Sequence, residues 1–292
     1  MELVIDSFES GQLETFNYHL TNIAGKDQGG YIGCHPALHE AGARLYGKNI
    51  KFSVLLNEGF NREGVCDNGL IHGFFDAFGV ANDFNLAKWQ EFATGCSYFQ
   101  GNVLITKLLK TVCGDGAGHA IWQGSHDYTT SFNSCLALND FNVLRGCVAG
   151  VMMQIPKDDS DGRKSLFSYQ QIPKRWGEVC LAFHQSVKES RKDYIKDSTG
   201  FIDSICGVMA GQNYSVFKAS EILYPKNPLS DDTLSEIIDN AMEFCDSFKS
   251  LERLGCRREY AIQGKFATGF DIDLQNRYCT KLSLELQKFC LQ

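Results

Sequence analysis

Two segments of the chain share one sequence pattern, in which a cysteine is followed by a glycine three residues later and by a histidine six residues later. The first segment contains His72 followed by Gly73, and the second contains His119 followed by Ala120. Very small residues beside an imidazole allow neighbouring helices to approach closely around the ring. The repeated pattern therefore indicates a centre where several imidazoles converge, which is typical of a metal site.

A third cluster lies upstream and contains His35 and His39. Their spacing of four residues would place both imidazoles on one face of a helix, where they could bind one ion. Glu40 comes directly after His39, so its side chain would point about 100° away from that face. Asp76 follows His72 by four residues, which adds a carboxylate to the helix face that carries His72.

These spacings predict a metal site with imidazole ligands and two candidate catalytic carboxylates. The predicted ligands are His35, His39, His72 and His119. Asp76 would be a ligand or an orienting base, and Glu40 is the second catalytic candidate. The donor types suit iron, copper, zinc or manganese and do not choose among them. Further carboxylates that could accept a hydrogen bond from the second nitrogen of a ligating ring are those of Asp115 and Asp127.

Two other interpretations of the same residues stay open. Each histidine could be a partly buried polar side chain that is hydrogen-bonded to a neighbouring helix. Alternatively, the ligands could include the thiols of Cys34, Cys66 and Cys113. The sequence contains no Cys-x2-Cys pair, which argues against a zinc ribbon or finger, and it lacks the His-Glu-x-x-His signature of metalloproteases.

The elements that would position these residues are helices. The clearest is an amphipathic segment over 234–248, whose apolar residues recur at three- and four-residue intervals. Ser230 supplies an N-terminal cap, and Gly255 breaks the pattern before a returning helix over 256–266. Similar apolar stripes run over 86–92, over 104–112 with an end at Cys113–Gly114, and over 136–152 with a polar turn at 139–140.

Segments that begin with a cysteine recur at intervals of 32 to 59 residues, which is near the size of a helix pair with variable loops. Because strand patterns rich in Val, Ile and Thr are scarce, we predict an all-α fold. The predicted arrangement is a series of irregular tandem helical hairpins that forms a solenoid or a closed α/α ring, and an irregular helical bundle is the alternative. In the later segments, the position of the histidine is taken by Met153, Gln212 and Ile262, so the predicted site belongs to the N-terminal half.

A polar run from Lys157 to Lys164 indicates an exposed loop near the middle of the chain. We therefore expect a His-bearing half over 1–155, a polar loop over 156–175 and a helical scaffold half over 176–292. These parts would belong to one continuous domain.

The chain has twelve cysteines, and three pairs of them have similar separations. Each pair would join two antiparallel helices near their loop: Cys135 with Cys147, Cys245 with Cys256, and Cys279 with Cys290. A disulfide that closes such a loop contributes about 3 kcal/mol. Disulfides favour an oxidising compartment, periplasmic or secreted, whereas buried reduced thiols in the cytosol are the alternative. The first residues predict no secretory signal.

Composition limits the expected partners. The net charge is −7 over 292 residues and no basic stripe is present, so nucleic acid is not an expected partner. No apolar run approaches the roughly 20 residues of a membrane-spanning helix. The predicted site implies a small-molecule substrate.

The Cys-led elements at 34–39, 66–73 and 113–120 resemble those of uncharacterised bacterial proteins that carry His-Gly and Gly-x-Gly-His behind a cysteine. The resemblance covers residues 31–155 and implies that these residues act together, without implying an activity. From the residues, the predicted function is a metal-dependent enzyme with a mononuclear or dinuclear site. An oxidoreductase with non-haem iron or copper is preferred to a zinc hydrolase. The alternatives are a non-catalytic helical-repeat scaffold and a metal storage or delivery protein.

Overall fold

The fold is known from a computed structural model, which describes residues 6, 34–47, 69–82, 85, 88, 96, 103–156, 168–190, 199–225, 228–269 and 271–291. Within these ranges the regular elements are helices and no β-strand is found, which confirms the all-α prediction. The chain divides into two compact units, Met1–Gln154 and Ile155–Gln292. None of the described helices is long and apolar enough to cross a membrane. The solenoid or ring stays a prediction.

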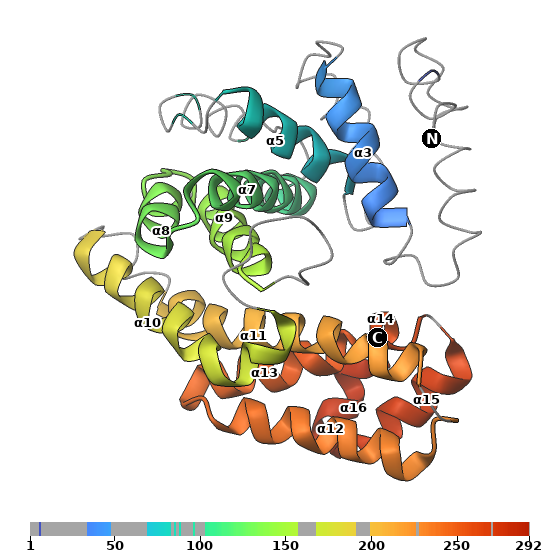
Figure 1. Cartoon of the computed structure of the whole chain (residues 1–292). Helices are drawn as coiled ribbons and strands as arrows, with labels where there is room; N and C mark the ends of the chain where they lie inside the picture. Colours follow the sequence, from blue (N-terminus) through green and yellow to red (C-terminus); the bar gives the residue numbers. More distant parts are fainter. Residues whose placement is uncertain are drawn as a thin grey trace. The chain divides into compact units, whose positions relative to one another are not determined.

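The first unit contains the helices that carry the predicted site. They are α3 (Cys34–Gly47), α5 (Gly69–Ala81), α7 (Val103–Ser125), α8 (Tyr128–Leu136) and α9 (Phe141–Gln154). Helix α5 packs against both α3 and α7, and α7 packs against α9 (Figure 1). The apolar residues that drive this packing are buried on every helix, and they include Leu38, Phe75, Trp122 and Val151.

Glycines set how closely these helices pack. A Cβ atom on Gly118 of α7 would overlap the carbonyl oxygen of Cys147 on α9, and a Cβ atom on Gly150 of α9 would overlap the carbonyl oxygen of Asp115. The two backbones are therefore in direct contact. This contact also corrects the prediction that a helix ends at Cys113–Gly114, because α7 continues through these residues to Ser125. Its glycines are points of close approach and do not end the helix.

The hairpin of α8 and α9 agrees with the predicted turn at 139–140. The side chain of Asp127 accepts a hydrogen bond from the backbone N–H of Thr130 and caps α8. Asp140 accepts hydrogen bonds from the N–H groups of Asn142 and Val143 at the start of α9, and its carboxylate lies 2.7 Å from Nζ of Lys110. The charged pair and the cap therefore fix α9 to α7.

The described part of the second unit consists of a 3-10 turn and seven helices. They are the turn Tyr169–Gln171, α10 (Ile172–Ser190), α11 (Thr199–Leu223), α12 (Asp231–Asp246), α13 (Ser250–Ile262), α14 (Gly264–Ala267), α15 (Ile272–Lys281) and α16 (Leu284–Cys290). The last residues of the predicted loop over 156–175 are thus the first turn of α10, while the polar run within it lies outside the described residues.

The predicted amphipathic helix is α12. Its apolar stripe is buried, and the hydroxyl of Ser230 accepts a hydrogen bond from the N–H of Thr233, as a cap should. The prediction that Gly255 interrupts the next helix is wrong, because α13 begins at Ser250 and runs through Gly255. A Cβ atom on Gly255 would lie 3.0 Å from the carbonyl oxygen of Ser204, so this glycine allows α13 to approach α11.

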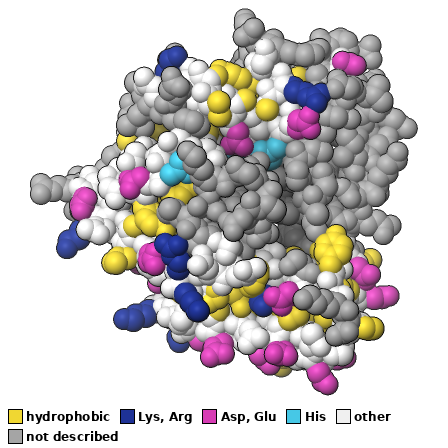
Figure 2. Space-filling view, viewed as in Figure 1, with side chains coloured by type: hydrophobic (Ala, Val, Ile, Leu, Met, Phe, Trp, Pro, Cys, Tyr) yellow, Lys and Arg dark blue, Asp and Glu magenta, His cyan; other side chains and the backbone are white. Residues whose placement is uncertain are grey.

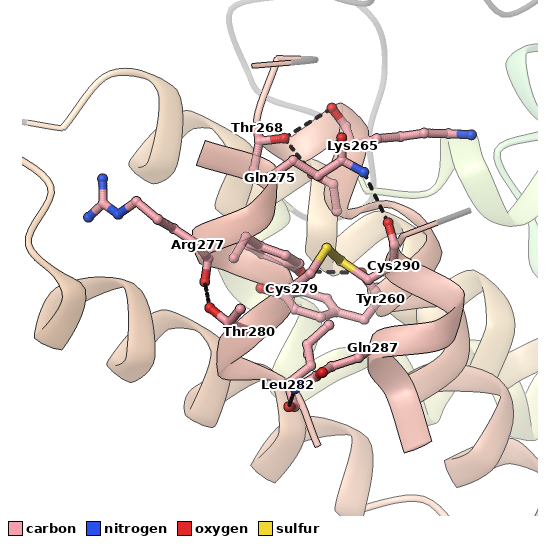
Figure 3. Close-up of a disulfide and its surroundings, with 12 residues drawn as sticks. Tyr260, Lys265, Thr268, Gln275, Arg277, Cys279, Thr280, Leu282, Gln287 and Cys290 are labelled. Carbon is pink, nitrogen blue, oxygen red and sulfur yellow. Dashed lines mark hydrogen bonds between the residues drawn. A yellow bond between two sulfur atoms is a disulfide. The ribbon is translucent and has the colours of Figure 1, made fainter. Parts of the chain in front are cut away.

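Five disulfides join cysteines of the described residues, and they include all three predicted pairs. Figure 3 shows Cys279–Cys290, which links α15 to α16 beside the buried ring of Tyr260. The Nε2 group of Gln275 donates to the carbonyl oxygen of Cys290 at 3.0 Å and ties the same two helices. The two pairs that were not predicted are Cys96–Cys113 and Cys180–Cys206. Disulfides of this number fit an oxidising compartment.

Candidate metal centre

Three histidines from three helices lie together in the first unit. His39 comes from α3, His72 from α5 and His119 from α7, and one ring nitrogen of each lies within 4.8 Å of the other two. The ring centroids of His72 and His119 are 4.5 Å apart, and that of His39 is 5.5 Å from His72 and 6.3 Å from His119. All three side chains are buried, with exposed fractions of the residues between 2% and 7%.

Close backbone contact brings these rings together. A Cβ atom on Gly73, the residue after His72, would overlap the carbonyl oxygen of His39, so α3 and α5 touch at the position of the two histidines. On α7, Gly116 faces the ring of Phe75, which a Cβ atom there would meet at 2.7 Å. Gly73 and Gly116, two small residues of the repeated sequence pattern, therefore allow the close approach of helices around the histidines that the sequence predicted.

Carboxylates pair with the histidines across the helix interfaces. Nδ1 of His39 lies 3.2 Å from Oδ2 of Asp76 on α5, and Nε2 of His72 lies 2.8 Å from Oδ2 of Asp115 on α7. The same Asp115 oxygen lies 3.7 Å from Nε2 of His119, one turn further along α7. His39 and His72 thus each take a carboxylate from the next of the described helices, α5 and α7 respectively.

The third histidine has an amide partner on α9. Nδ1 of His119 lies 2.8 Å from Nε2 of Gln154, whose Oε1 accepts a hydrogen bond from Gln123 at 3.2 Å. Gln154 is 1% exposed. An amide can offer either its oxygen or its nitrogen to the ring, so the orientation of Gln154 is linked to which nitrogen of His119 carries the proton.

The donor set is suited to a transition metal ion. Neutral imidazoles each present one lone pair, and the Asp115 oxygen lies close to two of them. Ligand atoms around one tetrahedral zinc ion lie roughly 3.4 Å apart, because each metal–nitrogen bond is about 2.0–2.1 Å long. Small rotations of the side chains would bring three nitrogens that lie within 4.8 Å of one another to this spacing.

The carboxylates are the more exposed part of this group of side chains. The side chains of Asp76 and Asp115 are 23% and 16% exposed, whereas those of His72 and His119 are 2% exposed. On the face drawn in Figure 2, histidine side chains occupy only small areas of the surface, near acidic side chains.

The predicted site residues fall into three groups. His39, His72 and His119 converge and Asp76 pairs with His39, as described. Glu40 is exposed and forms an ion pair with Arg44, outside the group of three histidines. His35 belongs to α3, and its side chain lies outside the described residues. The catalytic roles of Asp76 and Glu40 and the ligand role of His35 stay predictions.

Several side chains have roles that differ from the alternatives considered for them. Cys113 is bonded to Cys96, so the alternative in which its thiol is a ligand is wrong for the oxidised protein. Asp127 caps α8, whereas Asp115 contacts two of the three histidines. Gln154 was not predicted. A polar residue at the end of the apolar stripe of α9 was the available signal.

Comparisons with protein-family models, with curated proteins and with solved structures found no match for this chain.

Proposed function

We propose that this protein binds a transition metal ion through His39, His72 and His119, with a carboxylate oxygen of Asp115 as the fourth donor. The observation that supports the proposal most is the convergence of three buried imidazoles from three separate helices, two of which lie beside the carboxylate of Asp115. Polar side chains are buried only where partners satisfy them, and a cation shared by three lone pairs satisfies all three rings together.

The other polar contacts support this assignment of ligand atoms. Asp76 lies next to Nδ1 of His39, so a hydrogen bond from Nδ1–H to the carboxylate would leave Nε2 for the ion. For His119, coordination through Nε2 requires Nδ1 to carry the proton, and the amides of Gln154 and Gln123 must then turn over so that the oxygen of Gln154, in place of its nitrogen, faces Nδ1. Such hydrogen bonds to carboxylates and amides orient ligating rings in many metal sites.

Within this proposal, the reaction class we favour is metal-dependent oxidation or reduction with non-haem iron or copper, ahead of hydrolysis by zinc. Both require a position where water or substrate can reach the ion. The partial exposure of Asp76 and Asp115 supports access on that side. Movement of the Asp115 carboxylate away from the ion would open the fourth position to a small molecule.

Metal analysis of protein purified without an affinity tag tests the proposal. We expect about one equivalent of a transition metal, and d-electron absorption bands would distinguish iron or copper from zinc. His72→Ala and His119→Ala should abolish the bound metal while leaving the helical circular dichroism nearly unchanged. His126→Ala, which follows α7 and lies outside the group of three histidines, is the matched control and should retain the metal.

Two other outcomes would point to the alternatives. Several rapidly exchanging equivalents would indicate storage or delivery of metal. Less than about a tenth of an equivalent, with no binding of added zinc, copper or iron above micromolar affinity, would contradict the metal site and leave a helical interaction scaffold.

A further inference from the structure

A second cluster of reactive side chains lies in the other unit, where three helices meet at the disulfide Cys180–Cys206. Cys180 belongs to α10 and Cys206 to α11, and Glu252 of α13 brings a carboxylate oxygen within 4.8 Å of both sulfur atoms. His184 follows Cys180 by one helical turn, and its Nε2 lies 2.9 Å from Oε1 of Glu252. An imidazole–carboxylate pair is therefore next to a disulfide.

Among the described disulfides, Cys180–Cys206 differs in the side chains that lie beside it and in its exposure. In the part of the chain that the structure describes, only this cluster and the three histidines bring three such side chains within 4.8 Å of one another. Cys180 is also the most exposed of the described disulfide cysteines, at 7%, whereas the others are at most 1% exposed. Thiol–disulfide exchange requires access for the attacking thiolate, so this disulfide is the best placed of the five to react.

The backbone fixes this arrangement. A Cβ atom on Gly207, the residue after Cys206, would overlap the carbonyl oxygen of Glu252, so α11 and α13 are in contact at this level. The indole Nε1–H of Trp176 donates to the carbonyl oxygen of Cys206 at 3.0 Å, which ties α10 to the same place on α11. The carboxylate thus belongs to a rigid three-helix junction.

We propose that Cys180–Cys206 is an exchange-active disulfide that oxidises thiol pairs of a partner molecule. A partner thiolate attacks Sγ of Cys180, and a mixed disulfide forms as the Cys180–Cys206 bond breaks. The electron pair leaves on Sγ of Cys206, which takes the proton shared by His184 and Glu252. The second partner thiolate then attacks the mixed disulfide and releases Cys180 as a thiolate. The partner gains one disulfide, and this protein gains the two electrons as a pair of cysteines.

In this reaction Glu252 is the proton donor nearest to the sulfur, and His184 is a positioning residue that acts through Glu252. Supply of a proton to the leaving thiolate of Cys206 lowers the barrier to reduction, and removal of that proton by the same pair lowers the barrier to reoxidation. The pair should therefore change the rates of reduction and reoxidation together and leave their ratio almost unchanged. This inference concerns the second unit and does not depend on the proposed metal site.

The test follows exchange of the intact native protein with glutathione. Samples are quenched with an alkylating reagent at a series of times, and mass spectrometry identifies the labelled cysteines. We expect Cys180 and Cys206 to be labelled at least about tenfold faster than Cys135 and Cys147. Equal rates for the two pairs, or faster labelling of Cys135–Cys147, would overturn the proposal.

Variants separate proton donation from a structural role. Glu252→Gln and His184→Gln should each slow both reduction and reoxidation of Cys180–Cys206 by about tenfold or more. The ratio of disulfide to dithiol in a glutathione buffer and the melting temperature should change little. The control is Glu178→Gln, which removes an exposed ion pair with Arg175 on the same helix and should leave the rates unchanged. Unchanged rates in both test variants would contradict the role of the pair.

Discussion

Nε2 of His72 on α5 lies 2.8 Å from Oδ2 of Asp115 on α7, and the same oxygen lies 3.7 Å from His119. One carboxylate therefore faces two imidazoles from two helices. This relationship gives Asp115 a larger part in the proposed metal centre than its sequence position indicated, because it can balance the charge of an ion as well as bind it.

Replacement of Asp115 should weaken metal binding more than replacement of an exposed acid. We expect Asp115→Asn to lower the affinity for zinc about 10- to 100-fold, because a charged donor becomes a neutral amide. The affinity can be measured by competition with a chelator of known strength. Asp239→Asn on the exposed face of α12 is the control. Equal affinities in the two variants would show that the Asp115 carboxylate neither binds nor orients the ion.

The amide of Gln154 provides a second test of ligand geometry. Gln154→Glu offers only acceptor oxygens to Nδ1 of His119, so it should favour coordination through Nε2 and retain or strengthen metal binding. Gln154→Leu removes the acceptor and should lower the affinity about tenfold. Nitrogen NMR of the histidine rings reports the tautomer directly. The same affinity in both variants would argue against coordination through Nε2 of His119.

The close helix contacts predict unequal effects of three glycine substitutions. Gly73→Ala and Gly118→Ala place a methyl group onto a neighbouring carbonyl oxygen, so each should lower the free energy of unfolding by about 1–3 kcal/mol. Gly177 on α10 has no atom within 4 Å of an added Cβ atom, so Gly177→Ala should raise stability by about 0.5–1 kcal/mol. Urea unfolding measures all three. Gly73→Ala should also weaken metal binding, since it displaces α3 at His39.

The pair of Asp140 and Lys110 predicts a dependence of stability on pH. Burial raises the pKa of Asp140, but the hydrogen bond from Lys110 and those from the N–H groups of Val143 and Asn142 outweigh it, so the pKa lies below its usual 3.8. A depressed folded-state pKa contributes stability above the unfolded-state pKa, and this contribution is lost as the pH falls through the folded-state value.

Asp140→Asn should therefore lower the free energy of unfolding by about 1–2 kcal/mol at neutral pH. The difference between the two proteins should shrink as the pH falls from about 5 toward 2. Denaturant unfolding at several pH values measures it. A difference that stays constant over this range would show that the carboxylate charge does not contribute.

Much of the local structure was predictable because it depends on neighbours in the sequence. The apolar periodicity and the Ser230 cap define α12, and the short spacing of Cys245 and Cys256 defines its link to α13. Gly255 was interpreted as a helix break because a glycine has the same local effect at a helix end and at a helix crossing. Only the position of α11 distinguishes the two cases.

In the candidate site, too, the features that depend on neighbouring residues were predictable, and those that depend on helix crossing were not. The repeated sequence pattern identified His72 and His119, and the helical spacing identified His39. The same spacing suggested that His72 and Asp76 share a helix face, but Asp76 pairs with His39 on α3. Which carboxylate meets which imidazole depends on how α3, α5 and α7 cross, and sequence separation carries no such information. Gln154 was missed for the same reason, since it reaches His119 from another helix.

His39 and His119 are separated by 80 positions in the chain and approach each other inside one compact unit. An ion held by both would close that long loop reversibly, with an entropic effect on the unfolded chain comparable to that of a covalent crosslink. Removal of the ion by a chelator would then lower the stability of the first unit, as reduction of a disulfide lowers the stability of the helical hairpin that it links. The resistance of the first unit to proteolysis would therefore depend on whether the ion is bound.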